Sequence, residues 1–493
     1  MKNIIFLLIL FFQSVNCLKA QVNTFSFLYK SRLNKASLIP VEDSDNNYIL
    51  PMILFTGKPW APSDIDRALL MKFTPKGDTS CYYYTIPDSA FSFQNIIKTS
   101  DDGYLVAGAS KAIITRDSVN LLLIKLNNKF EIEWKKHYYL YGNWEMDITR
   151  IFPLDDNDFI LAGMVTKFPS IFIYPYLVRI DQYGNITRET IYNSYCGSRY
   201  EYLLNSSKTR ILMFANGLPP HSNGLSVTIF DTTFTYLSSH VLPVLGIGVG
   251  GNPFHAKWLN DTNFIFSYQK RLVGSPFDDK EFTIQIHDTL FNLLQFDQFG
   301  LPDSYDCPAW VKGFDFRHPD TIFYAANIGL AFGPPPSGYT NWFMVRQTDG
   351  QLKERYRHFY GGDSFYFVDH IIATSDGGCF VGSRKFDFGT GNFELLFLKL
   401  NSEGMLVGTN DPDIQQQMSL VYPNPAYEEV VLETYLDEST IKIFDVNGRT
   451  VGQYSGVKGR NAINLNGLPA GVYVLSLYAK GKFIENYKFI KNP

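Results

Sequence analysis

Cysteine is scarce in this sequence, and the cysteines are far apart. Only five occur in 493 residues, and Cys81, Cys196, Cys307 and Cys379 are each separated by more than seventy residues. No Cys-x-x-Cys pair is present, which excludes the usual zinc and dithiol motifs. Four cysteines in so long a chain do not form a disulfide framework. We expect free, mostly buried thiols at these positions.

The sequence also lacks the short motifs of common catalytic and cofactor sites. Its eight histidines show no His-Glu-x-x-His or other close ligand spacing. A Gly-x-Ser-x-Gly elbow and a phosphate-cradling glycine loop are absent, and the glycine-rich Gly246–Gly251 lacks the required Lys, Ser or Thr. The net charge of −4 does not suggest nucleic acid or an anionic membrane as a partner. We therefore assign no cofactor, no metal ligand and no catalytic residue.

Long hydrophobic runs are missing as well, apart from nine residues near the N-terminus. Ile4–Phe12 follows the basic start Met1–Asn3 and precedes Leu18-Lys19-Ala20, which is typical of a signal peptide spanning residues 1–20. Nine apolar residues are too few to cross a bilayer as a helix, which needs about 20. Cys17 raises a lipoprotein alternative, but Asn16 is too bulky for a lipobox, so simple cleavage is favoured. We expect export and no transmembrane segment.

What the sequence does contain is a repeat of about 55 residues, rich in aromatic and glycine residues. Each unit has an apolar strand with a basic residue near its end, followed by a short polar turn. The aligned positions are Lys72, Lys125, Arg179, Ile229, Ile286, Arg346 and Lys399, and the fourth and fifth copies are degenerate. An Asp/Asn/Gly turn precedes each strand by about twenty residues. Four strands per unit, repeated seven times, predict an all-β fold with a seven-bladed β-propeller over residues 21–407.

The first strand of the chain has a special place in this scheme. Phe25–Tyr29 has the phase of a fourth strand. We expect it to pair with Leu395–Leu400 in the last blade and thereby to remove an exposed sheet edge.

Acidic clusters occur in several turns. Asp43–Asn47, Asp101-Asp102, Asp155–Asp158 and Asp278-Asp279 have the oxygens for calcium or for a carboxylate pair. Three of the four recur at the same repeat phase, before a strand, where Asp and Asn side chains bond the nearby backbone. The turn interpretation is therefore favoured.

The last residues form a different unit, which follows a polar linker at 408–417. Residues 418–493 contain about seven short strand-like segments, which predicts a small β-sandwich. Asn447-Gly448 predicts a type I′ hairpin turn, and Gly481 separates the final hairpin arm. The segment Tyr422-Pro423-Asn424-Pro425 precedes the first long strand.

These residues resemble the type A C-terminal sorting domain of type IX (Por) secretion cargo in Bacteroidota. The matching positions are Tyr422, Pro423, Asn424, Pro425, Asp445, Gly448, Gly471 and Tyr473. The resemblance implies recognition by the outer-membrane translocon, removal after export, and surface attachment or release. The repeat resembles, more loosely, the propellers of secreted Bacteroidota proteins, a group without a single function.

Two aromatic loops interrupt the repeat and are candidates for ligand contact. They contribute Tyr141 and Trp144 from the segment 137–144, and Tyr339 and Trp342 from the insertion 332–342. Flat aromatic rings suit stacking on sugars or peptides, although packing between blades is the more common role. Three functions stay open: a non-enzymatic binding platform for glycan or protein, a polysaccharide hydrolase or lyase with its site at the channel mouth, and a structural surface-layer component.

Overall fold

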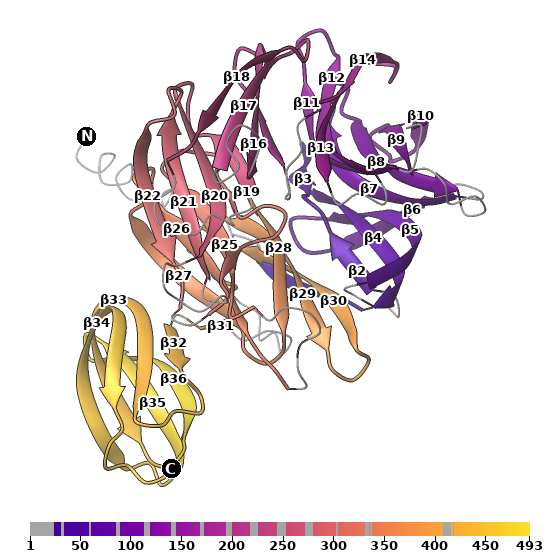
Figure 1. Cartoon of the computed structure of the whole chain (residues 1–493). Coiled ribbons are helices and arrows are strands. Elements are labelled where there is room, and N and C mark those ends of the chain that lie inside the picture. Colours follow the sequence, from indigo (N-terminus) through magenta and orange to yellow (C-terminus); the bar gives the residue numbers. More distant parts are fainter. Residues whose placement is uncertain are drawn as a thin grey trace, which may run out of the picture. The chain divides into compact units, whose positions relative to one another are not determined.

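The structure is a computed structural model in which every regular element of the described part is a β-strand (Figure 1). The described residues are 24–30, 34–58, 61–84, 89–112, 119–139, 144–167, 172–193, 200–216, 225–243, 253–271, 280–301, 304–330, 335, 338–407, 416–417 and 419–493. The predicted signal peptide lies outside them. The chain divides into two compact units, one comprising Met1–Gly197, Asp369–Ser383 and Glu394–Asp411 and the other the remaining segments.

Seven sheets of consecutive antiparallel strands confirm the predicted propeller blades. The first three blades are β2 (Asn34–Ser37), β3 (Val41–Glu42), β4 (Tyr48–Lys58), β5 (Ala61–Phe73) and β6 (Thr79–Tyr84); β7 (Ser89–Lys98), β8 (Tyr104–Ala112), β9 (Val119–Leu126) and β10 (Ile132–Tyr139); and β11 (Trp144–Pro153), β12 (Phe159–Lys167), β13 (Ile173–Ile180) and β14 (Ile186–Ile191). The next three are β15 (Glu201–Leu204), β16 (Arg210–Asn216), β17 (Leu225–Asp231) and β18 (Tyr236–Val241); β19 (Pro253–Trp258), β20 (Asn263–Arg271), β21 (Lys280–Asp288) and β22 (Leu293–Phe299); and β23 (Cys307–Pro308), β24 (Phe314–Asp315), β25 (Ile322–Ile328), β26 (Trp342–Thr348) and β27 (Glu354–Gly361).

The seventh blade takes its outer strand from the beginning of the chain, as predicted. It contains β28 (Tyr366–Ala373), β29 (Cys379–Asp387) and β30 (Asn392–Leu400), and β1 (Phe25–Tyr29) pairs with β30. Phe25 lies opposite Lys399 and Tyr29 opposite Leu395. Aromatic rings strengthen this junction, because Phe25 stacks on Phe73 of the first blade at 5.7 Å between centroids.

One tight turn follows the third strand of all seven blades, and in the first six it leads directly into the fourth strand. The N–H of the first turn residue donates to the carbonyl four residues later, and the fourth turn residue has positive φ. That fourth residue is Gly77, Phe130, Gly184, Phe234, Phe291, Leu352 or Gly404. A left-handed conformation costs a non-glycine residue about 1–2 kcal/mol. Here the four apolar side chains are buried, and burial of such a side chain contributes roughly 1.5–3 kcal/mol.

This turn corrects the sequence register in the sixth blade. The first turn residue follows the predicted basic position by two residues in six blades, as in Asn127 after Lys125, but Asp349 follows Arg346 by three. The structural equivalent in the sixth blade is therefore Gln347. A shift of one residue in a strand reverses the face of a side chain. Accordingly, Arg346 on β26 forms ion pairs with Glu354 and Asp297. It does not pair with the turn before β25, which is the position of the acidic turn in the other blades.

In three other blades the basic position and the acidic turn are partners. Lys125 Nζ lies 2.8 Å from Asp101 Oδ2, and Lys399 Nζ lies 2.9 Å from Asp376 Oδ2. Arg179 pairs with both Asp156 and Asp158. Burial raises the pKa of Asp101, but hydrogen bonds from Lys125, Thr99 and the Gly103 N–H outweigh this effect and hold that pKa at about 2. In these three blades the basic residue and the acidic turn of the sequence repeat therefore form one ion pair, which we call the blade clamp.

The acidic turns have the predicted role. Asp43 Oδ1 accepts the N–H groups of Asp45 and Asn47, and Asp101 Oδ1 accepts that of Gly103. Asn46, Asp102 and Asn157 have φ near 60°. Asp278 and Asp279 lie outside the described residues, as does the glycine-rich segment.

The C-terminal domain forms one sheet with its own core. Its strands are β32 (Ser419–Tyr422), β33 (Glu429–Phe444), β34 (Thr450–Asn464), β35 (Gly471–Ala479) and β36 (Lys482–Lys491). The predicted segments merge into five strands, because β33 and β34 are long. A register shift between Thr434 and Glu438 lets β33 pair with β32 in one half and with β35 in the other. This allows the sheet to enclose a core in the manner of a small sandwich.

The prediction for the turn at Asn447-Gly448 was wrong in type. Only Gly448 of the pair has positive φ, 76°, and its N–H donates to the Asp445 carbonyl at 3.0 Å. This is a type I turn followed by a left-handed glycine, which is the three-residue hairpin loop. The two consecutive positive φ values of a type I′ turn occur instead at Lys480 and Gly481, 49° and 75°.

Two further expectations differ in part. Cys307 and Cys379 are buried and form no disulfide within the described residues, but Cys81 is exposed on β6, and Cys196 is outside the described residues. The predicted linker 408–417 ends in a strand, because β31 (Gln416–Gln417) pairs with Phe359 and Tyr360 of β27. The sixth blade therefore gains a strand from the segment that precedes the C-terminal domain.

Candidate functional site

The segment Tyr422–Pro425 is tied to the end of the chain by Asn424. The Asn424 Oδ1 accepts the Ile490 N–H at 2.9 Å, and its Nδ2 donates to the Lys488 carbonyl at 3.2 Å. The peptide bonds before Pro423 and Pro425 are both cis. Ala426 then continues the contact through backbone hydrogen bonds to Ile490 and Asn492 of 2.7 Å. An amide side chain thus substitutes for the backbone pairing that proline cannot supply.

The other motif residues also shape the backbone. Asp445 Oδ1 accepts the N–H groups of Asn447 and Arg449, and the Arg449 N–H bond is the main reason that the pKa of Asp445 is lowered. Gly471 begins β35. The Tyr473 hydroxyl donates to the Pro469 carbonyl at 2.7 Å, and its ring stacks on Phe489 at 5.6 Å. These positions support the fold of the C-terminal domain.

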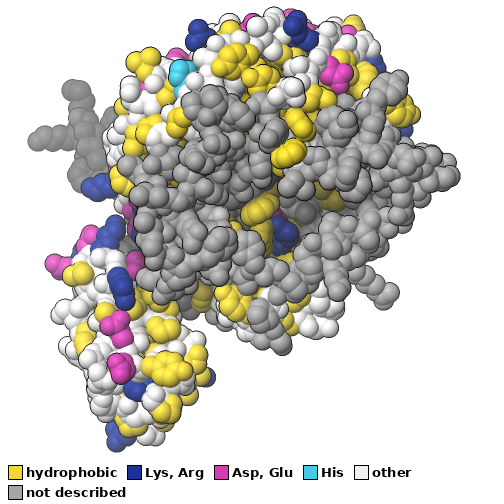
Figure 2. Space-filling view, in the orientation of Figure 1, with side chains coloured by type: hydrophobic (Ala, Val, Ile, Leu, Met, Phe, Trp, Pro, Cys, Tyr) yellow, Lys and Arg dark blue, Asp and Glu magenta, His cyan; other side chains and the backbone are white. Residues whose placement is uncertain are grey.

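The surface of this domain mixes charged, polar and hydrophobic side chains. Figure 2 shows acidic, basic and hydrophobic side chains interspersed over its visible face. Tyr427, Val446, Val457 and Phe483 are each more than half exposed.

The first strand of the domain also contacts the sixth blade. Leu420 is buried within the hydrophobic cluster of that blade, together with Ile328, Met344 and Phe359, and Tyr422 packs against the same cluster. Burial raises the pKa of the Tyr422 hydroxyl to about 12. The contact adds to the pairing of β31 with β27.

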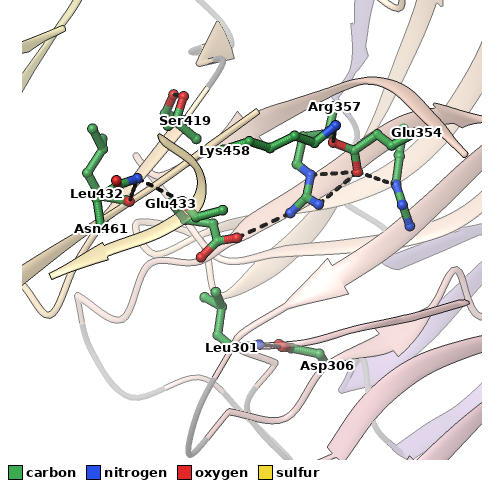
Figure 3. Close-up of polar contacts among 12 residues, drawn as sticks. Leu301, Asp306, Glu354, Arg357, Ser419, Leu432, Glu433, Lys458 and Asn461 are labelled. Atoms are coloured by element: carbon green, nitrogen blue, oxygen red, sulfur yellow. Dashed lines mark hydrogen bonds and ion pairs between the residues drawn. The ribbon is translucent and has the colours of Figure 1, made fainter. Parts of the chain in front are cut away.

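A chain of alternating charges runs along the same contact (Figure 3). Arg346 pairs with Asp297 and with Glu354, at 2.5 Å from Nε to Oε2. Arg357 lies 2.7 Å from Glu354 and 3.6 Å from Glu433 of the C-terminal domain, and Lys458 lies 3.7 Å from Glu354. Burial raises the pKa of Glu354, but the charges of Arg357 and Arg346 outweigh this effect and bring that pKa below its ordinary value. Burial raises the pKa of Glu433.

The aromatic residues predicted as ligand contacts have varied environments. Tyr141 lies outside the described residues, and Trp144 is the first residue of β11, where its side chain is not described. The Tyr339 hydroxyl donates to the Gly329 carbonyl at 2.8 Å, and the Trp342 ring covers Gly362 closely. Both are partly buried against hydrophobic clusters. Ligand contact by these residues stays a prediction.

An aromatic cluster that the sequence analysis missed lies between β23 and β29. Trp310 is 37% exposed, and its ring lies 5.6 Å from that of Phe367. The Arg384 guanidinium lies over the Phe367 ring at 4.2 Å and within 5.7 Å of the Phe393 ring. Phe388 on the same hairpin is 38% exposed. Trp310 does not belong to the repeated sequence pattern. A tryptophan outside that pattern was the one sequence feature that could have pointed to this cluster.

Other polar groups in the sixth blade are committed to its loops. Asp306 accepts hydrogen bonds from Leu301 N–H, Gly329 N–H and Ser304 Oγ of 2.5, 2.8 and 2.7 Å. Burial raises the pKa of Asp306 to about 7 in spite of these bonds. Within the described ranges, no three His, Cys, Asp or Glu side chains are arranged to hold a metal ion. In the same ranges, no helix has the length and apolar character to span a membrane.

Comparison with known proteins identifies the C-terminal domain. Residues 420–492 match the family model described as the secretion system C-terminal sorting domain. No curated protein matches the chain.

Solved structures resemble the fold at low identity. PorZ, an essential bacterial surface component of the type-IX secretion system of Porphyromonas gingivalis, is 8% identical with a TM-score of 0.30, covering 95% of this chain and all of PorZ. A protein of unknown function from Dyadobacter fermentans is 9% identical (TM-score 0.44; coverage 77% and 97%). The β-propeller domain of the Trilobed protease from Pyrococcus furiosus is 11% identical (TM-score 0.37; coverage 78% and 97%). These similarities carry no argument about function.

The range of the family match contains all of the motif residues described above. The domain implies engagement of the type IX secretion translocon and delivery to the cell surface or the medium. The chain therefore carries a type IX secretion C-terminal sorting domain behind a seven-bladed β-propeller.

Proposed function

We propose that the propeller is a non-enzymatic binding platform for an extracellular glycan. The aromatic cluster around Trp310 carries this proposal, because it presents an exposed indole beside a cation whose position is set by stacking on Phe367. Aromatic faces stack on the apolar faces of sugar rings. A planar guanidinium offers several N–H donors to hydroxyl or carboxylate oxygens.

A glycan-array screen of the full mature chain tests the proposal, with product formation read in the same samples. We expect binding without turnover, and at least a tenfold loss of affinity for Trp310→Ala. Stacking of this kind contributes about 0.5–1.5 kcal/mol beyond the buried area. The matched control is Phe296→Ala, which removes a half-exposed ring from β22 of the fifth blade and should leave binding unchanged.

Other outcomes would select another function. Turnover of a polysaccharide would identify a hydrolase or lyase and would contradict the proposal. The absence of both binding and turnover would also contradict it and would favour a protein partner or a structural surface-layer role. Tyr339 and Trp342 remain secondary candidates for contact, and equal losses in Trp310→Ala and Phe296→Ala would show that Trp310 has no specific part.

A further inference from the structure

The outer edge of the sixth blade is covered differently from the other outer edges in the described sheets. In the second to fifth blades the outer strands β10, β14, β18 and β22 end their sheets, whereas β27 is followed by β31. Unpaired strand edges are commonly protected by additional chain or by charge. Here the additional chain leads directly into the sorting domain, whose Leu420 and Tyr422 reach the core of the blade.

We propose that Leu420, Tyr422, Glu433 and Lys458 of the sorting domain form a reversible clasp with Glu354 and Arg357 of the sixth blade, and that the closed clasp hides Tyr422 of the sorting motif. Pro423, Asn424 and Pro425 are exposed, whereas Leu420 is buried and Tyr422 partly buried. The closed state therefore presents Pro423, Asn424 and Pro425 and covers Tyr422 in part.

The charge network explains why this contact can open. Arg357 is held at 2.7 Å by Glu354 within the blade, and Glu354 is also held by Arg346. The contact of Arg357 with Glu433 across the clasp is longer, 3.6 Å, which exceeds hydrogen-bond distance. When the sorting domain leaves, the buried charges of the blade keep their partners. Opening thus avoids the large cost of an orphaned buried charge.

The sorting domain is equally self-sufficient. Its cluster of Val430, Ile441, Leu475, Phe489 and their neighbours contains no residue of the propeller. The contact of Glu433 with Arg357 is longer than a hydrogen bond, and burial raises the pKa of the Glu433 carboxyl. Closure depends on apolar contact of Leu420 and Tyr422, on β31, and on the absence of charge repulsion.

Hydroxyl-radical footprinting of the full chain tests the clasp through the side chain of Tyr422. Tyr427, which is 60% exposed, serves as an internal reference in the same peptide region. We expect Tyr422 to be modified several-fold more slowly than Tyr427 in the parent chain. Glu433→Lys places a cation beside Arg357 and should raise the Tyr422 rate at least threefold. Glu433→Gln, which keeps the size and removes the charge, should not raise it.

Glu429→Lys is the matched control. It makes the same charge change four residues earlier on β33, where Glu429 pairs with Arg460 of the same domain at 3.3 Å. The Tyr422 rate should match the parent. Buried Phe489 reports on folding, and if it becomes reactive in Glu433→Lys, the exposed-surface change Lys458→Glu decides, since it places a like charge beside Glu354.

Two results would overturn the proposal. One is equal reactivity of Tyr422 and Tyr427 in the parent chain. The other is a Tyr422 rate in folded Glu433→Lys or Lys458→Glu that equals the rate in Glu429→Lys.

Discussion

The propeller and the sorting domain use their characteristic residues in opposite ways. In the propeller one turn is built seven times, and its left-handed position accepts three glycines, three phenylalanines and one leucine. In the sorting domain the same turn occurs at Asp445–Arg449, but Asn424 makes a contact without a copy through its bonds to β36. Repetition tolerates replacement because neighbouring packing compensates. A motif residue whose contact has no copy lacks such compensation. The sorting domain could therefore be recognised from its motif residues, whereas the repeat did not identify a ligand of the propeller.

The largest expected effect is at a turn where an apolar side chain has replaced glycine. Phe130 is buried and stacks on Tyr104 at 5.1 Å between centroids. We expect Phe130→Ala to destabilise the chain by about 3–5 kcal/mol. Phe130→Gly should cost about 1 kcal/mol less than Phe130→Ala, which reverses the usual order, because φ is 64° and glycine adopts this conformation freely.

Chemical denaturation of both variants checks this prediction. If Phe130→Ala is the more stable variant, the left-handed turn is not the reason for the pattern.

The second effect is a pH dependence in the sixth blade. The pKa of Asp306 is raised to about 7 by burial, so between about pH 4 and 7 the folded state holds a proton that the unfolded state has released. The stability from this group is therefore present at acid pH and is lost as pH rises through 7. We expect the apparent Tm to fall by roughly 5 °C more between pH 5 and pH 8 in the parent than in Asp306→Asn.

Thermal melts of the two proteins at both pH values give the comparison. Parallel slopes, or a steeper slope in the variant, would contradict the role of Asp306.

A smaller effect is expected in the sorting motif. Asn424→Ala removes two hydrogen bonds to β36 and should destabilise the sorting domain by about 1–3 kcal/mol. Asn424→Asp keeps an acceptor for the Ile490 N–H and should lose less. Hydrogen exchange of the peptide covering 486–492 measures the loss, with peptides of β5 as the control. Equal protection in all three proteins would show that the hydrogen bonds of Asn424 to β36 do not stabilise the sorting domain.

The smallest effect is at Gly448. Nothing lies within 4 Å of the position that its Cβ would take, so Gly448→Ala should cost only the strain of a positive φ, about 1 kcal/mol. A loss above 3 kcal/mol in chemical denaturation would mean that the turn has a contact which this account omits.

Much of the architecture could be predicted from the sequence because it repeats. The period located all seven blades, and the phase of Phe25–Tyr29 located its partner strand. The register at Arg346 was misplaced because the equivalent residue, Gln347, is not basic, so Arg346 one position earlier matched the sequence pattern although adjacent residues lie on opposite faces of a strand. The turn at Asn447-Gly448 was assigned from a dipeptide that is compatible with more than one loop type.

The candidate sites were less accessible to sequence reasoning. Trp310 and Phe367 are distant in sequence, and the Trp310 N–H donates to the carbonyl of Val368 next to Phe367. Glu433 and Arg357 come from different domains, and no local spacing records such a contact. Sequence spacing identifies residues that contact their neighbours along the chain. The contacts of Trp310 with Phe367 and of Glu433 with Arg357 instead join different sheets.

Export of the chain with and without the sorting domain is the most direct test of the central claim. In a bacterium with a type IX secretion system, the full chain and a chain lacking Val421–Pro493 are followed by cell fractionation, with protease resistance as the check on folding. We expect the full chain on the surface or in the medium and the shortened chain retained, folded, in the periplasm. A shortened chain that still reaches the medium would contradict the assignment of these residues as the sorting domain.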